Sequence, residues 1–170
     1  GIGKACVESF LARGAIAVGL DINPHIVDTF NRPGYLGLVC DVSDENSIIQ
    51  SIQTVAQKFN RLDMLVLNAG MFPPGRRIEE LPLAEWQKVM RVNLDANLVF
   101  LRECYPLLKA APNGGRVVVN GSRNVPAPGP GAAAYSASKA AVTQLARVAA
   151  LEWGKDGIRV NVVHPDAVFD

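Results

Sequence analysis

The sequence predicts a single α/β domain built on a doubly wound, mostly parallel sheet. Short, continuous apolar runs rich in Val, Leu and Ile alternate along the chain with segments of helical spacing. Continuous apolarity is typical of strands covered on both faces, as in a parallel sheet. Strands that alternate with helices imply right-handed crossovers. The predicted strands are Ala15–Leu20, Tyr35–Cys40, Met64–Leu67, Arg116–Val119 and Ile158–Val163.

The helical segments differ in how much of their surface is apolar. An early helix has one apolar side and ends before Arg13-Gly14, and a second, with Ser43 as its expected cap, continues to Phe59. The segments at about 82–105 and 133–153 are apolar nearly all the way round. Such helices are buried on two sides, of which the sheet covers only one. We expect a second subunit on the other side, in a homodimer or homotetramer; the alternative is a further part of the same chain.

The ends of the sequence indicate a domain truncated on both sides. The chain opens inside a glycine turn, Gly1-Ile2-Gly3, and stops soon after its last predicted strand. A strand before Gly1 would be central in a doubly wound sheet. We therefore expect residues 1–170 to be one incomplete domain of a longer polypeptide, without its first strand and its C-terminal substrate lid.

Composition excludes several classes of protein. The 17 Lys and Arg residues balance 16 Asp and Glu residues, and 49% of the chain is hydrophobic. Scattered basic residues give no footprint for nucleic acid, and no apolar run is long enough to span a membrane. The three cysteines are spaced as core thiols, and no residue set suggests a metal site. These features predict a cytoplasmic protein that acts on a small molecule.

The N-terminal half carries a pattern suited to a dinucleotide. Gly1-Ile2-Gly3 leads directly into a helix, where backbone N–H groups can face a pyrophosphate. Asp21 ends the next predicted strand, about 20 residues later, where a carboxylate accepts hydrogen bonds from an adenosine ribose and repels a 2′-phosphate. This spacing favours NAD over NADP; the alternative is a solvated turn residue. Further cofactor contacts are expected at the ends of later strands, from Asp41, Val42, Asn68, Ala69, Gly70 and Pro165.

The C-terminal half carries candidates for proton transfer. Tyr135 and Lys139 are one helical turn apart, and a nearby ammonium favours a phenolate and so lowers a tyrosine pKa. Tyr135 would then exchange a proton with an alcohol or carbonyl oxygen, while Lys139 also holds the nicotinamide ribose. Ser122 follows the predicted strand Arg116–Val119 and would polarise the substrate oxygen. Asn93, buried in mid-helix, would hold a water that relays protons to Lys139, or would be a satisfied core amide.

The candidate residues occur along the chain in the order glycine turn, Asp21, Asp41, Asn68-Ala69-Gly70, Asn93, Ser122 and Tyr135-x-x-x-Lys139. Together they resemble the short-chain dehydrogenase/reductase family over essentially the whole chain. The resemblance implies a Rossmann-like fold and an NAD(P)-dependent carbonyl/alcohol oxidoreductase. It also implies an Asn-Ser-Tyr-Lys tetrad, here Asn93, Ser122, Tyr135 and Lys139, and dimers or tetramers formed by the two apolar helices.

Three departures from the family pattern point to a particular group within the family. Leu67-Asn68 replaces a double Asn, Gly121-Ser122 replaces Ser-Ser, and the segment from His164 to Asp170 replaces Asn-Pro-Gly and a later Thr. Asp170 takes the place of that Thr, which in the family contacts the nicotinamide carboxamide. The ending resembles the dehydrogenase module of bifunctional aldolase/short-chain dehydrogenase proteins, which implies a fused aldolase domain and lactaldehyde as a substrate. The alternatives are an NADPH-dependent 3-oxoacyl-type reductase and a non-catalytic nucleotide-binding module.

Overall fold

The computed structural model describes residues 1–166, which form two parallel sheets with helices on both sides. All strand pairs are parallel, as predicted, and each strand lies within two residues of its predicted bounds. The first sheet contains β1 (Ala17–Asp21) and β2 (Tyr35–Val39). The second has the order β3–β4–β5, from Met64–Leu67, Arg116–Asn120 and Arg159–Val163.

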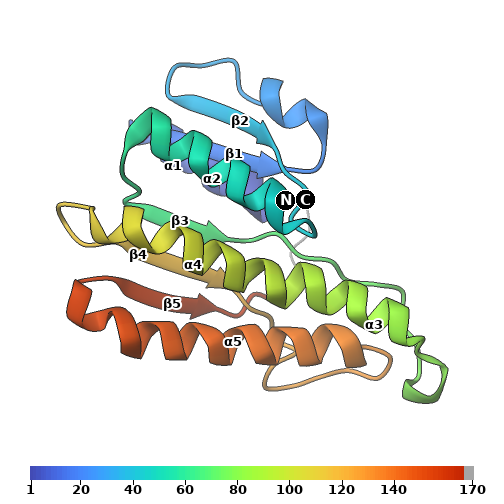
Figure 1. Cartoon of the computed structure of the whole chain (residues 1–170). Helices are drawn as coiled ribbons and strands as arrows, with labels where there is room; N and C mark the ends of the chain where they lie inside the picture. The colour runs from blue at the N-terminus through green and yellow to red at the C-terminus, as the bar shows by residue number, and fades with distance from the viewer. Residues whose placement is uncertain (167–170) are drawn as a thin grey trace.

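The two sheets lie apart, with β1 and β2 above β3, β4 and β5 in the view of Figure 1. A cavity of about 1620 Å³ lies between them. Residues of β1 and β3 line this cavity, together with residues of α1 (Ile2–Ala12). Within residues 1–166, β1 pairs only with β2, and β3 pairs only with β4, so one edge of each sheet borders the cavity. The sheet is thus divided where one continuous sheet was expected. The central strand expected before Gly1 would lie at this position, and it stays a prediction.

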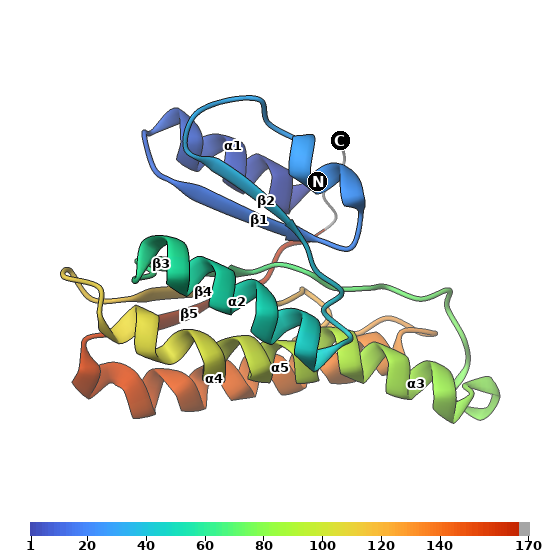
Figure 2. The ribbon, with the colours of Figure 1, turned by 45° about the horizontal axis from the view of Figure 1, so that its top comes forward.

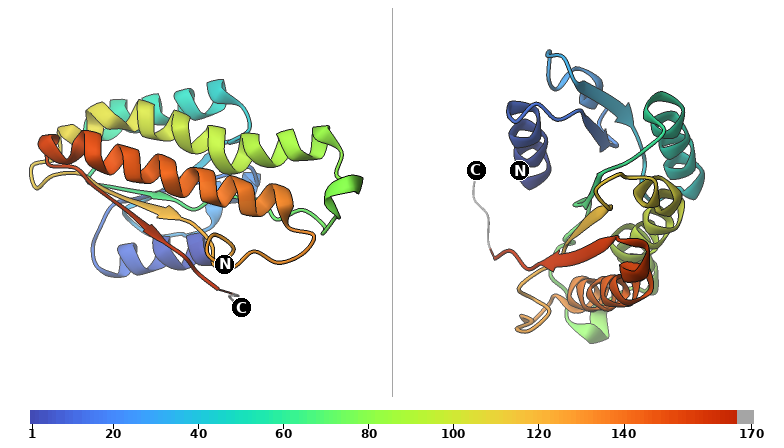
Figure 3. Two further views of the ribbon diagram at one scale, coloured as in Figure 1. Left: turned by 90° about the horizontal axis from the view of Figure 1, so that it is seen from below. Right: turned by 90° about the vertical axis from the view of Figure 1, so that its left-hand side faces the viewer.

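The helices cover opposite faces of the strands (Figure 3). Helix α1 packs against β1 on one side. The other side carries a layer in which α2 packs against α4, while α5 packs against β5 (Figure 2). The bounds of these three helices are Glu45–Phe59, Ala96–Lys109 and Ala133–Trp153. The core, including Leu108, Val117, Val142 and Ile158, lies between this layer and the second sheet. No helix of the described chain is both long and apolar enough to cross a membrane.

The cap of α2 corrects one expectation, because Asp44 and not Ser43 takes this position. The Asp44 side chain accepts a hydrogen bond from the Asn46 N–H at 3.0 Å. Ser43 instead donates both its N–H, at 2.8 Å, and its hydroxyl, at 2.7 Å, to Asp41 Oδ1. The Asp41 carboxylate thus engages the hydroxyl that was expected to cap the helix.

The segment predicted as one helix over 82–105 contains a change of helical type. Helix α3 (Leu83–Met90) continues into a π-helical turn, Arg91–Asp95, and then into α4, which extends past the predicted end to Lys109. A π turn adds a residue to one helical turn and is frequent at functional sites. This turn contains Asn93, whose side chain is fully buried.

The cysteines confirm the interpretation as core thiols at two of the three positions. Cys40 and Cys104 are buried, and Cys6 is half-buried; all three are free. Burial raises the pKa of Cys104 to about 12, so its thiol stays protonated at neutral pH.

Candidate active site

Polar side chains gather where β3, β4 and α5 meet. Lys139, in the second turn of α5, is only 6% exposed. Its Nζ donates a hydrogen bond to the main-chain carbonyl of Asn120, the last residue of β4, at 2.8 Å. Burial lowers the pKa of Lys139, because desolvation disfavours the ammonium form. The end of β4 therefore fixes the Lys139 amine in one place.

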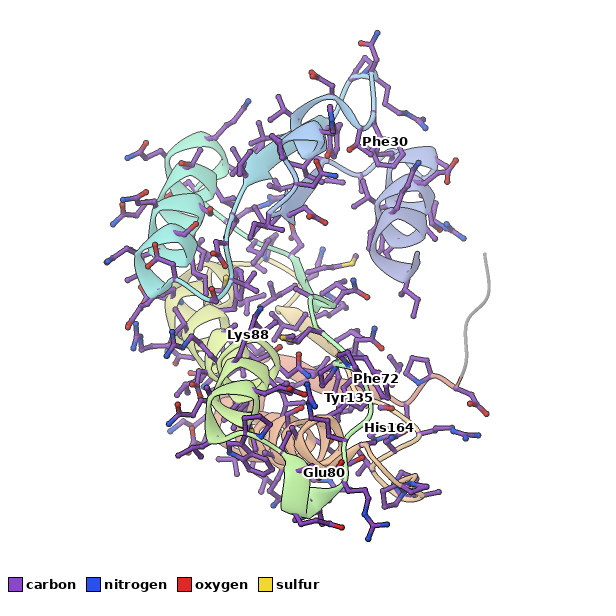
Figure 4. All side chains as sticks on the ribbon, turned by 90° about the vertical axis from the view of Figure 1, so that its right-hand side faces the viewer. Phe30, Phe72, Glu80, Lys88, Tyr135 and His164 are labelled. Carbon is purple, nitrogen blue, oxygen red and sulfur yellow. The ribbon has the colours of Figure 1, made fainter. Side chains whose placement is uncertain are left out.

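Tyr135 lies one turn before Lys139 on the same side of α5. The Lys139 Nζ is 5.8 Å from the centroid of the Tyr135 ring, which is half-buried. The exposed Phe72, from the loop after β3, meets that ring edge-on, with 4.6 Å between centroids and an angle of 62°. Tyr135 and Phe72 lie next to each other, well apart from Phe30 (Figure 4). The helix and the loop thus fix the phenol from two sides.

Ser122 lies just beyond β4 and is buried. Its Oγ accepts a hydrogen bond from the Asn124 N–H at 3.1 Å. The Nδ1 atom of His164, just past β5, lies 3.2 Å from the Ser122 nitrogen and 3.0 Å from the Ser122 carbonyl oxygen. The backbone at Ser122 is therefore held by the segment that follows the neighbouring strand.

Asn93 connects the π turn to the loop after β3. Its Oδ1 accepts from the Met71 N–H at 2.8 Å, and its Nδ2 donates to the Met71 carbonyl and to Ser138 Oγ, both at 3.0 Å. A Cβ placed on Gly70 would lie 3.3 Å from Asn93 Oδ1 and 3.4 Å from Lys139 Nζ. Asn93, Gly70 and Lys139 thus lie together, and a side chain at position 70 would crowd both polar groups.

The predicted pyrophosphate contact is the start of α1. Gly1 precedes the helix, whose first turn contains no acidic residue of its own. A Cβ on Gly3 would lie 2.8 Å from Asn68 Nδ2. The Oδ1 atom of Asn68 accepts a hydrogen bond from Asn120 Nδ2 at 2.9 Å. These contacts bring the first turn of α1 to the ends of β3 and β4.

The remaining cofactor candidates lie at other strand ends. Asp21 is exposed at the end of β1, and its Oδ1 accepts from the Asn23 N–H at 2.9 Å. Hydrogen bonds from Ser43 lower the pKa of Asp41 just past β2. Val42 lines the large cavity, the exposed Ala69 adjoins Gly70, and the Pro165 carbonyl accepts from the Arg123 N–H at 3.1 Å. Asp170 lies outside the described residues.

Sequence reasoning missed Asn120 and Phe72 and gave His164 no role. Asn120 joins Asn68 to Lys139, and its Oδ1 is buried without a hydrogen-bond partner among the described residues. Asn120 could have been found from the sequence, because it is a polar residue directly after the apolar run Val117–Val119. It therefore ends a buried strand at the edge where parallel sheets bind ligands. Within residues 1–166, no three His, Cys, Asp or Glu side chains form a group that could hold a metal ion.

Comparison with protein families gives a match over almost the whole sequence. Residues 1–169 match the model of the family described as short chain dehydrogenase. Two curated relatives of stated activity cover 99% of the chain: D-threitol dehydrogenase of Mycolicibacterium smegmatis, 31% identical, and meso-2,3-butanediol dehydrogenase of Serratia marcescens, 33% identical. The chain spans 66% and 67% of their respective lengths. It spans 26% of the uncharacterized oxidoreductase YuxG of Bacillus subtilis, at 34% identity.

Solved structures share the arrangement of elements described above. A short chain dehydrogenase from Mycobacterium smegmatis superposes with a TM-score of 0.90 at 28% identity, covering 99% of this chain and 71% of that chain. The RhlG/NADP active-site complex from Pseudomonas aeruginosa superposes with a TM-score of 0.92 at 32% identity, covering 99% and 69%. The fold is therefore Rossmann-like, as the sequence predicted.

Proposed function

The chain belongs to the short-chain dehydrogenase family, and we propose that it is the catalytic domain of an NAD-dependent oxidoreductase. The proposed reaction interconverts a small alcohol or hydroxy compound and its carbonyl form. The observation that carries this proposal is the Lys139 amine, which is buried, bonded to the end of β4 and 5.8 Å from the Tyr135 ring. A cation fixed beside a phenol is an arrangement suited to proton transfer near neutral pH.

Each polar group has a distinct role in the proposal. Tyr135 gives or takes the proton at its phenolic oxygen, and Lys139 places its buried amine 5.8 Å from the centre of that ring. The Ser122 Oγ accepts a hydrogen bond from the Asn124 N–H, which leaves its own proton available to donate to the substrate oxygen. Asn93 keeps the loop at Met71 in place beside Gly70 and Lys139.

The residues present fit a nicotinamide dinucleotide. The lining of the site leaves space and one hydrogen-bond acceptor for a ligand. A glycine turn starts α1, and side chains added at Gly3 and Gly70 would meet Asn68, Asn93 or Lys139. The Asn120 Oδ1 atom is buried and has no hydrogen-bond partner among the described residues. Gly1, Ile2 and Gly3 would hold the pyrophosphate, and Asp21 and Asp41 would hold the adenosine. Val42, Asn68, Ala69, Gly70, Lys139 and Pro165 would line the rest. When bound, the cofactor supplies or accepts the hydride.

Asp21 supports the choice of NAD. Its exposed carboxylate at the end of β1 would repel the 2′-phosphate of NADP. Replacing Asp21 by Ala is expected to reduce the preference for NADH over NADPH at least tenfold, since it removes both the ribose contact and the repulsion. The two binding constants are measured by cofactor fluorescence. An unchanged ratio of the constants contradicts the assignment of NAD.

The acid/base role is tested at Tyr135. Tyr135→Phe removes the hydroxyl but keeps the ring contact with Phe72, so turnover should fall by roughly 10²–10⁴-fold while NADH binding stays nearly unchanged. Tyr105→Phe, at a phenol on α4, is the matched control and keeps full activity. Full activity in Tyr135→Phe contradicts the proposed mechanism and favours a site of another kind.

A small polyol is the proposed class of substrate. Two relatives are named for dehydrogenation of D-threitol and meso-2,3-butanediol, so these two alcohols are the first probes, with lactaldehyde added because of the resemblance to aldolase-fused proteins. An NADPH-dependent reductase is the second candidate, supported by the similarity to RhlG, which was solved with NADP. Faster turnover of a 3-oxoacyl thioester with NADPH than of D-threitol or meso-2,3-butanediol with NAD would favour this second candidate.

A further inference from the structure

We propose that His164 is a positioning residue for Ser122, and that position 121 is a glycine so that the imidazole can reach the Ser122 backbone. This inference rests on the proposed function, because it assigns His164 an effect on the reaction through Ser122. It also joins two departures from the family pattern, Gly121 in place of Ser and His164 in place of Asn, into one structural feature.

The segment after β4 is bonded to the segment after β5 at successive positions. The Gly121 N–H donates to the Val163 carbonyl at 2.8 Å, which extends the pairing of the two strands. Two residues later, the Arg123 N–H donates to the Pro165 carbonyl at 3.1 Å. The Arg123 guanidinium also pairs with Asp166, at 3.1 Å between Nε and Oδ1. Ser122 lies between these two anchored neighbours.

At Ser122 itself, the bond comes from a side chain. His164 Nδ1 lies within hydrogen-bond distance of both the Ser122 N–H and the Ser122 carbonyl. A neutral imidazole accepts from the N–H in one tautomer and donates to the carbonyl in the other, and either bond holds the ring against this backbone. The imidazole therefore completes the series of contacts that fixes the buried Ser122.

Gly121 provides the space for this contact. A Cβ at position 121 would lie 2.6 Å from His164 Nδ1 and 2.8 Å from His164 Cε1. Both distances are shorter than a carbon atom can tolerate, so even an alanine would push the ring away from Ser122. The pair Gly121 and His164 is thus sterically matched, and the contact needs both residues.

The test is a double-mutant cycle between His164 and Ser122 in the full-length protein, with NAD and whichever of D-threitol and meso-2,3-butanediol the wild type oxidises faster. His164→Ala should lower kcat about tenfold, as expected for the loss of one positioning hydrogen bond, and leave the NADH dissociation constant unchanged within about twofold. In the Ser122→Ala background, the same change should cost less than about twofold, because the residue that it positions is absent. If the fold losses in kcat of the two single variants multiply in the double variant, the two residues act independently and the inference is overturned.

Two further variants separate positioning from general damage. His164→Asn keeps a donor and an acceptor at the place of Nδ1 and should retain kcat within about threefold of wild type. His25→Ala, at the chain's other histidine, leaves kcat unchanged. A His164→Asn variant as impaired as His164→Ala overturns the role of the hydrogen bond.

Amide hydrogen exchange measures the contact without a substrate. The peptide that contains Ser122 and Arg123 should exchange at least about tenfold faster in His164→Ala than in wild type, and unchanged exchange overturns the inference. If Tyr135→Phe and Ser122→Ala are both fully active while this exchange still accelerates, the proposed function fails and the structural contact stands. If Ser122→Ala is impaired and the cycle is additive, only the inference fails.

Discussion

At the scale of single residues, Asn93 shows what a buried amide does here. Its side chain makes three hydrogen bonds, to the two backbone groups of Met71 and to Ser138. The sequence left two interpretations open, a relay water or a satisfied amide, because neither the helical period nor the composition reveals a partner 22 residues away. The observed contacts satisfy the side chain and give it a structural role beside Gly70 and Lys139.

Replacing Asn93 by Ala tests this structural role. The Met71 N–H and carbonyl would lose their partners in a part-buried place, so the free energy of unfolding should fall by roughly 1–3 kcal/mol. Urea denaturation measures the change, and Asn113→Ala, at an exposed loop position, is the matched control with no loss. Wild-type stability in Asn93→Ala would contradict the role described for these bonds.

At the scale of elements, the sequence predicts the regular parts well and the irregular parts poorly. Helix α5 has its predicted bounds because its apolar positions and small residues all favour one long helix. The π turn at Arg91–Asp95 was not predicted; it contains Asn93, whose bond to Met71 joins residues 22 positions apart. The cap of α2 was assigned one residue too early, because the competition of Asp41 for Ser43 is visible only in the folded turn.

The packing between β2 and the adjacent 3₁₀ helix, η1 (Pro24–Asp28), gives a prediction at this scale. A Cβ on Gly37 would lie 2.1 Å from the Ile26 carbonyl oxygen, so an alanine there must separate β2 from η1. Gly37→Ala should therefore reduce stability by about 1–3 kcal/mol. Gly129→Ala is the control, since nothing lies within 4 Å of its added Cβ. Thermal denaturation compares the two, and equal melting temperatures would contradict the predicted overpacking.

At the scale of the whole molecule, the order of the strands assembles the site. Lys139 comes from α5, Asn120 ends β4 and Asn68 directly follows β3, and they meet because β4 lies between β3 and β5. The sequence predicted Lys139 and Asn68 as site residues from motif and spacing. It did not predict the bond from Lys139 to a main-chain carbonyl, because backbone acceptors leave no mark on residue type. The prediction of tertiary contacts of this kind requires the strand order as well as the motifs.

The apolar helices carry a prediction about assembly. Leu98 on α4 is 50% exposed and Leu151 on α5 is 85% exposed, so the helical layer presents large apolar side chains that a second copy would cover. We expect the full-length protein to be a homodimer or homotetramer, and Leu98→Glu with Leu151→Glu to dissociate it. Sedimentation measures the oligomeric state of the wild-type protein and of the double variant. Ile78→Glu, 78% exposed on another segment, is the control that stays assembled. A wild-type monomer at micromolar concentration would contradict the prediction.

The carbonyl that holds the Lys139 amine has a consequence for how this enzyme tolerates change. Since the acceptor belongs to the peptide bond at Asn120, it is present whichever amino acid is encoded there. Site-directed scanning of side chains would therefore never reveal this anchor. A substitution of Asn120 would remove the side-chain bond to Asn68 but leave this acceptor in place, and only a shift in the course of β4 would release the amine.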